Sequence, residues 1–168
     1  MGELTSLTAD GQNPGHCVSV TDVAIDDVRN PSLIRIRLRS SKTDQFGRGV
    51  DIYLGRTGAD LCPVSALLAY LAVRGKEPGP LFRLQDGRYL TKGVFISKVR
   101  SALAVLGYDE AAYAGHSFRI GAATTAAERG IEDSLIKMMG RWESSAYQLY
   151  VRASHQSLAS MSRRLVVS

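Results

Sequence analysis

The tetrapeptide His116-Ser117-Phe118-Arg119 holds the residues of this chain that are best suited to bind an anion and move a proton. It opens a segment with helical spacing, so His116 and Arg119 are three positions apart and share one helix face. An arginine guanidinium is a planar fork that matches two phosphate oxygens, and a helix start adds N–H groups and positive dipole. Histidine can move a proton near neutral pH. The tetrapeptide therefore predicts a phosphate site, and the alternative is a capping histidine beside a surface arginine.

The sequence patterns of several common enzyme sites do not occur in this chain. It has no GxxxxGK[ST] loop for a nucleotide phosphate, no HExxH pair for zinc and no strand-linked GxGxxG for a dinucleotide. Gly115-His116-Ser117 begins like the nucleophile turn of serine hydrolases, but the fifth residue of that motif must be glycine and is Arg119 here. We therefore expect no bound nucleotide, no metal and no other cofactor, and we exclude a serine hydrolase.

Further polar and aromatic residues of interest lie on either side of the tetrapeptide. Downstream, Gly140-Arg141-Trp142 is followed by Tyr147 and Tyr150, and upstream Ser41-Lys42-Thr43 lies in a loop after a basic strand. Each has an ordinary interpretation when taken alone. A tryptophan is commonly part of a core, and Lys42 is one of many surface lysines.

The elements that must position these residues follow from the hydrophobic period. The segments Val18–Ile25, Leu33–Leu38 and Val50–Leu54 are rich in β-branched residues and separated by turn residues, which predicts three antiparallel strands. Beyond Pro63 the period becomes helical. We expect six helices, over Pro63 to Gly75, Leu90 to about Leu106, His116–Arg129, Glu132–Met139, Ser144–Arg152 and His155–Arg164. The second, third and fourth of these helices should end at Gly107, Gly130 and Gly140. The predicted fold class is mainly α, with a small antiparallel three-stranded sheet near the N-terminus.

Length and composition indicate one folded domain over residues 1–168. The length of 168 residues is close to the typical length of one domain, about 150 residues. Hydrophobic residues make up 45% and charged residues 22%, both near the averages of folded proteins. No apolar run approaches the roughly 18 to 20 residues that cross a bilayer, and no signal-peptide pattern opens the chain. Cys17 and Cys62 have no metal-ligand spacing, so we expect two buried free thiols in a reducing, intracellular compartment.

The basic residues are concentrated in two blocks. The net charge is +5, and the segments Arg29–Arg56 and Arg74–Arg100 each hold seven basic residues against two acidic ones. Such blocks favour a polyanionic partner such as nucleic acid. The alternative is a charged surface that only keeps the protein in solution.

Taken together, these residues resemble the tyrosine recombinase (phage integrase) family, whose motif is HxxR, then His or Trp about two dozen residues later, then a nucleophilic Tyr. Trp142 comes 23 residues after Arg119, and Tyr150 comes 8 residues after Trp142. In more detail, residues 41–49, Cys62-Pro63-Val64 and the segments around Arg119 and Trp142 are similar to recombinases of eukaryotic retroelements of the DIRS and Ngaro type. The resemblance covers the whole chain. It implies the catalytic fold of that family, recombination or integration of a mobile element, and location in the nucleus.

The resemblance also implies a role for each candidate residue. Tyr150 would attack a DNA phosphodiester, forming a 3′-phosphotyrosine and freeing a 5′-hydroxyl without ATP or metal. Arg119 would bind the non-bridging oxygens, whose charge grows in the transition state, and His116 would relay or accept a proton. Trp142 would donate its indole N–H to the phosphate, and Lys42 would protonate the leaving 5′-oxygen.

Two tyrosines compete for the role of nucleophile. Tyr147 and Tyr150 share a helical face at i, i+3 spacing. We prefer Tyr150, because Leu149-Tyr150-Val151-Arg152 resembles the tyrosine context of the family and Tyr147 lies only five residues after Trp142.

The resemblance further implies that the chain is truncated at its N-terminus. The family places a first catalytic Arg three residues before a Glu, and Gly2-Glu3-Leu4 resembles the end of that motif, so the Arg would fall one position before Met1. The separate N-terminal DNA-clamping domain of the family would also be missing. We expect these 168 residues to cleave DNA feebly or not at all.

Three interpretations of the function follow. The first is the catalytic domain of a recombinase that acts on double-stranded DNA and self-associates there through a terminal segment, His155 to Arg164. The second is a non-catalytic DNA-binding remnant of a retroelement recombinase, with binding that weakens steeply with salt. The third is a type IB topoisomerase, which uses similar chemistry.

Overall fold

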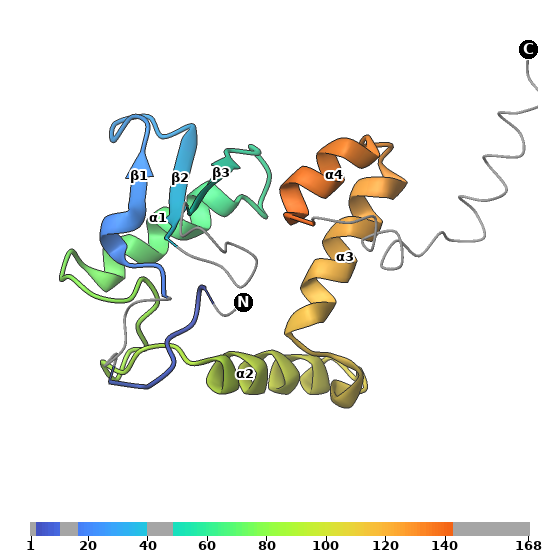
Figure 1. Cartoon of the computed structure of the whole chain (residues 1–168). Helices are drawn as coiled ribbons and strands as arrows, with labels where there is room; N and C mark the ends of the chain where they lie inside the picture. The colour runs from blue at the N-terminus through green and yellow to red at the C-terminus, as the bar shows by residue number, and fades with distance from the viewer. Residues whose placement is uncertain (1–2, 11–16, 40–48, 143–168) are drawn as a thin grey trace, which may run out of the picture. The chain divides into compact units, whose positions relative to one another are not determined.

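The computed structural model describes residues 3–10, 17–39 and 49–142, and the chain divides into two compact units, Met1–Val99 and Arg100–Ser168 (Figure 1). The first unit holds a sheet and a helix, and the second is helical. Helix α2, Lys92–Val105, contains the boundary between them. In the described part of the chain, no helix is both long enough and apolar enough to cross a bilayer.

The sheet has three antiparallel strands in the order β1-β2-β3, as predicted: Val23–Ile25, Leu33–Leu38 and Val50–Gly55. Val23 pairs with Ile36 across β1 and β2, and Arg35 pairs with Tyr53 across β2 and β3. Burial alternates strictly along β2, because successive side chains of a strand point to opposite faces. Ile34, Ile36 and Leu38 are thus buried on one face, and Leu33 and the two arginines are exposed on the other.

The prediction of one strand over Val18–Ile25 was wrong in its first half, where Val20–Asp22 form a 3₁₀ turn, η2. The Ser19 hydroxyl accepts a hydrogen bond from the Thr21 amide at 3.4 Å, and the Asp22 carboxylate accepts one from the Ser19 amide at 2.9 Å. These side chains satisfy backbone groups locally and so compete with pairing in a sheet. The β-branched residues around them concealed this signal.

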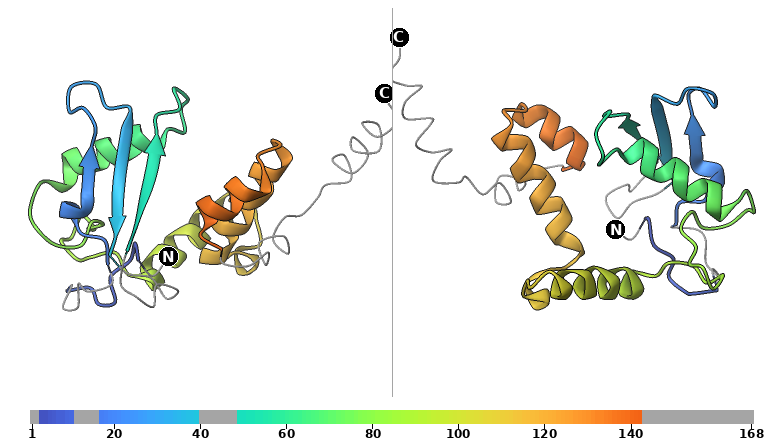
Figure 2. Two further views of the ribbon diagram at one scale, coloured as in Figure 1. Left: turned by 45° about the horizontal axis from the view of Figure 1, so that its top comes forward. Right: turned by 180° about the vertical axis from the view of Figure 1, so that it is seen from behind.

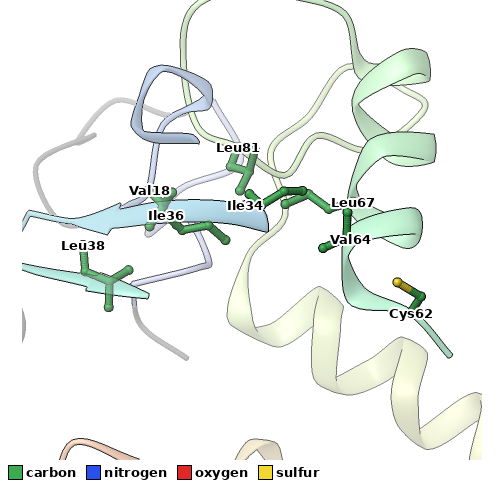
Figure 3. Packing of buried hydrophobic residues seen from close by; sticks show 8 residues of the cluster. All are labelled: Val18, Ile34, Ile36, Leu38, Cys62, Val64, Leu67 and Leu81. Carbon is green, nitrogen blue, oxygen red and sulfur yellow. The ribbon is translucent and has the colours of Figure 1, made fainter. Parts of the chain in front are cut away.

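Helix α1, Pro63–Arg74, covers one face of the sheet (Figure 2) and has the bounds that the sequence predicts. Pro63 suits the first turn, and Gly75, with φ of 78°, ends the helix. Figure 3 shows Val64 and Leu67 of α1 facing Ile34 of β2 and Leu81 of the following loop. The buried core of this unit consists of Val18, Ile34, Ile36, Leu38, Cys62, Val64, Leu67 and Leu81. Cys17 and Cys62 are buried free thiols, as expected.

Arg74, the last residue of α1, is buried and organises the loop that follows. Its Nε donates to the carbonyl of Leu81 at 3.0 Å, and its Nη2 donates to that of Pro80 at 2.9 Å. Its Nη1 donates to the carbonyls of Gly75 at 3.2 Å and Glu77 at 2.6 Å. A buried charge is tolerated only when its donors are satisfied. The guanidinium therefore acts as the hub on which residues 75–81 fold.

The second unit contains the helices α3, Gly115–Glu128, and α4, Asp133–Gly140, preceded by the 3₁₀ turn η3, Glu110–Ala112. With α2, these helices agree with the sequence prediction to within two residues at each end. Ala123 of α3 and Ile136 of α4 are buried against each other, and Ala126, Ala127 and Trp142 pack around them. The helices predicted over Ser144–Arg152 and His155–Arg164 lie outside the described residues. The predicted fold class, mainly α with a small antiparallel sheet, is confirmed.

Replacing Arg74 should destabilise the first unit. Arg74→Ala removes the donors of four backbone carbonyls and should lower the free energy of unfolding by about 3 kcal/mol. Arg74→Lys should recover part of this loss, because one ammonium cannot reach every carbonyl. Urea unfolding measures the effect. Arg88→Ala is the control, because among the described residues the side chain of Arg88 pairs with the exposed Asp86 alone. The interpretation fails if both alanine variants unfold at the same urea concentration.

Candidate functional site

The start of α3 presents His116 and Arg119 in its first two turns. The Ser117 hydroxyl accepts a hydrogen bond from the Ala114 amide at 3.0 Å, which ties the chain before the helix to its first turn. Ser117 is thus used in shaping the helix start. His116 and Arg119 are both exposed, one helical turn apart. The helical placement predicted for the tetrapeptide is confirmed.

The Arg119 guanidinium connects α3 to the end of α4. Its Nη2 donates a hydrogen bond to the carbonyl of Gly140, and its Cζ lies 4.8 Å from the ring centroid of Trp142. Such a cation–π contact contributes about 1 kcal/mol at a partly exposed site. A guanidinium carries five N–H donors. Among the described residues one of them is used on Gly140, so the others are available to an anion at the surface.

A tight reversal at the end of α4 brings Trp142 back over the two helices. The amide of Arg141 donates to the carbonyl of Met138, and the amide of Trp142 donates to that of Lys137, both at 3.1 Å. Arg141 takes the left-handed conformation, with φ of 55°. This pair of hydrogen bonds around a left-handed residue is a Schellman motif, which satisfies the last carbonyls of the helix.

The prediction that Gly140 closes this helix was wrong in position, because the left-handed residue is Arg141 and Gly140 is the last helical residue. Gly140 serves a different purpose. A methyl group on its Cα would overlap the ring of Trp142. Only glycine therefore lets the ring lie against the helix end while the carbonyl of the same residue receives Arg119.

Of the five residues to which the sequence analysis assigned roles, the structure brings Arg119 and Trp142 into contact and places His116 on the same helix as Arg119. Lys42 and Tyr150 lie outside the described residues, as does Tyr147. Their positions relative to Arg119, and the catalytic role of all five residues, stay predictions.

Cys62 has a chemical property that the sequence analysis missed. Hydrogen bonds from Ser65, through its side chain and its backbone, and one from the Thr57 amide at 3.4 Å lower the pKa of the Cys62 thiol to about 6. Burial alone would raise this pKa, so the donors around the sulfur outweigh it. The sequence could have indicated this, because Cys62 directly precedes the start of a helix, where thiolates are stabilised.

Two comparisons with known proteins agree. An integrase/recombinase xerD homolog from Selenomonas ruminantium is 33% identical over 122 residues, which are 68% of this chain and 36% of that protein. A crystal structure of XerA recombinase matches 90% of this chain and 50% of that chain, with a TM-score of 0.64 and 21% identity. The chain is therefore similar in sequence to an integrase/recombinase and has the fold of a recombinase. No family model matches it.

The tyrosine recombinase fold predicted from the motifs is thereby confirmed. The chain spans between about a third and a half of the length of the two recombinases that it matches.

Gly140→Ala should separate Trp142 from Arg119. The added methyl group displaces the indole ring, which breaks the cation–π contact and exposes the ring to water. Because Trp142 is the single tryptophan of the chain, its fluorescence emission should shift to longer wavelength, and the second unit should lose about 2 kcal/mol of stability.

The matched control is Gly121→Ala. This glycine lies within α3, and a methyl group there meets no atom within 4 Å. It should leave the emission unchanged and raise stability by about 0.5 to 1 kcal/mol, as alanine does in helix interiors. Unchanged emission in Gly140→Ala would contradict the packing of Trp142 on Gly140.

Proposed function

We propose that this chain is the catalytic part of a recombinase that cuts and rejoins DNA strands through a covalent phosphotyrosine. The observation that carries the proposal is the fixed guanidinium of Arg119, held at the protein surface by the carbonyl of Gly140 and the ring of Trp142. The sequence similarity of this chain to an integrase/recombinase also supports strand cleavage and rejoining. An exposed planar cation with several N–H donors is suited to the growing charge of a phosphoryl transition state.

In the proposed reaction, the Tyr150 hydroxyl oxygen forms a bond to the phosphorus, and the bond from phosphorus to the 5′-oxygen breaks. The phenol proton passes to His116, and Lys42 gives a proton to the departing 5′-oxygen. Arg119 binds the non-bridging oxygens throughout, and Trp142 keeps its guanidinium in place. Reversal of the same step, with another 5′-hydroxyl as nucleophile, joins strands and returns the tyrosine.

Finer parts of the proposal rest on sequence resemblance alone. The segments similar to DIRS and Ngaro recombinases support a mobile element as the biological setting and the nucleus as the location. Double-stranded DNA is the proposed partner, with self-association on it. Because the resemblance implies a further phosphate-binding arginine, we propose that efficient cleavage needs such a residue in addition to Arg119.

A specific observation favours the second candidate, DNA binding without chemistry. Arg119 already has a structural contact with Gly140 and a stacking contact with Trp142, so it would be retained in a protein that had lost catalysis. In that case DNA binding would fall steeply with salt, and no covalent adduct would form.

Covalent trapping on a nicked duplex separates the candidates. A chain extended by an arginine before Met1 should form a protein–DNA adduct that survives denaturation. Tyr150→Phe should abolish the adduct, and Arg119→Ala should slow its formation about 10²- to 10³-fold, as loss of one transition-state donor does. Tyr108→Phe, at an exposed tyrosine packed edge-on against Tyr113, should have no effect.

The outcomes are distinct. An adduct that persists in Tyr150→Phe but disappears in Tyr147→Phe reassigns the nucleophile. Salt-sensitive DNA binding with no adduct in any variant supports the remnant. Absence of both binding and adduct refutes the proposed function.

A further inference from the structure

Three arginines follow one another on the exposed face of the central strand. Arg35 and Arg37 alternate with the buried Ile34, Ile36 and Leu38 along β2, and Arg39 continues the alternation directly after the strand. Because side chains two positions apart share a face, the three arginines form one row, here called the arginine row. Their side chains are 51%, 45% and 57% exposed.

The carboxylates that contact the arginine row lie deeper than the arginines. Asp51 of β3 is 21% exposed and is shared by Arg35 at 3.7 Å and Arg37 at 3.3 Å, so two cations face one anion. Asp22 is 8% exposed, and its carboxylate accepts hydrogen bonds from the Arg39 Nε and from the Ser19 amide. The guanidinium groups are therefore more exposed to solvent than the carboxylates that they contact.

The spacing of the row matches a regular polyanion. A strand rises about 3.3 Å per residue, so successive arginines are about 6.6 Å apart. Along one strand of a duplex, phosphates rise about 3.4 Å along the helix axis and also turn around it, so neighbouring phosphates are roughly 7 Å apart in space. Tyr53, which pairs with Arg35 across the sheet, is 61% exposed and adds a hydroxyl donor beside the row.

We propose that the arginine row binds the phosphate backbone of double-stranded DNA, as a second contact surface besides the Arg119 site. The inference rests on the proposed function for its ligand, because that function requires DNA on the protein. The shared Asp51 orients the two guanidinium groups, whose side chains are about half exposed, and an exposed guanidinium is suited to bind phosphate oxygens. Contacts to phosphate position a duplex without selecting its sequence.

The test compares DNA binding by the full chain and by variants at two pairs of exposed cations. The probe is a fluorescent duplex of arbitrary sequence, titrated at several salt concentrations. The double variant Arg35→Gln/Arg37→Gln should bind about tenfold more weakly at low salt. Its slope of log K against log salt should be shallower by about 2, since each phosphate contact contributes about 0.9.

The matched control is Arg29→Gln/Lys76→Gln, which removes the same charge from exposed positions outside the strand. It should keep the salt slope of the parent chain. Asp51→Asn keeps both arginines and removes their shared anion, so it should tighten binding and steepen the slope. This variant tests the proposal even if the double variant unfolds.

Each outcome is decisive. Equal losses in the double variant and its control indicate a general charge effect and overturn the proposal, as does an unchanged slope in the double variant. Tighter binding of polyglutamate than of the duplex, lost in the same variant, identifies an acidic protein partner instead. If the arginine-row variants lose DNA binding but Arg119→Ala and Tyr150→Phe leave the amount of covalent adduct unchanged, the proposed function is refuted. DNA binding by the arginine row is then still supported.

Discussion

The contact of Arg119 with the carbonyl of Gly140 and the ring of Trp142 is the interaction on which the candidate site depends. It joins residues that are far apart in the chain, and it fixes a cation whose long side chain would otherwise sample many rotamers. The same contact needs glycine at 140 and a left-handed residue at 141. The geometry of the site is therefore set by the backbone at the end of α4 as much as by the arginine.

Arginines serve three different purposes in this molecule. Arg74 is buried and satisfies backbone carbonyls, Arg119 is exposed and held by a carbonyl and an indole ring, and Arg35 shares a carboxylate with its neighbour on an open sheet face. The guanidinium suits all three because it is planar, always charged and rich in donors. Burial and partners, which only the fold supplies, decide which purpose an arginine serves.

Much of the fold could be predicted from the sequence because local signals agreed with tertiary packing. Pro63 and Gly75 bound α1, and the alternation in β2 matches its burial. The failures came where side chains act on the backbone over short range. Ser19 and Asp22 form a capped turn inside an apparent strand, and Arg141 takes the place expected for glycine.

The candidate site was predictable only in part. The spacing of His116 and Arg119 predicts that they share a helix. No sequence pattern predicts that the Arg119 guanidinium lies against Trp142, or that Arg74 organises a loop. Both contacts join residues through side-chain packing, which has no sequence period. The lowered pKa of Cys62 arises in the same way, from donors that the fold brings to its sulfur.

Arg141 is the one non-glycine residue with positive φ in the described part of the chain. An L-residue in this conformation costs about 1 kcal/mol relative to glycine. The hydrogen bonds of the corner come from backbone amides, so a chain with glycine at 141 would make the same reversal with less strain. Backbone geometry and side-chain chemistry are thus separable at this single position.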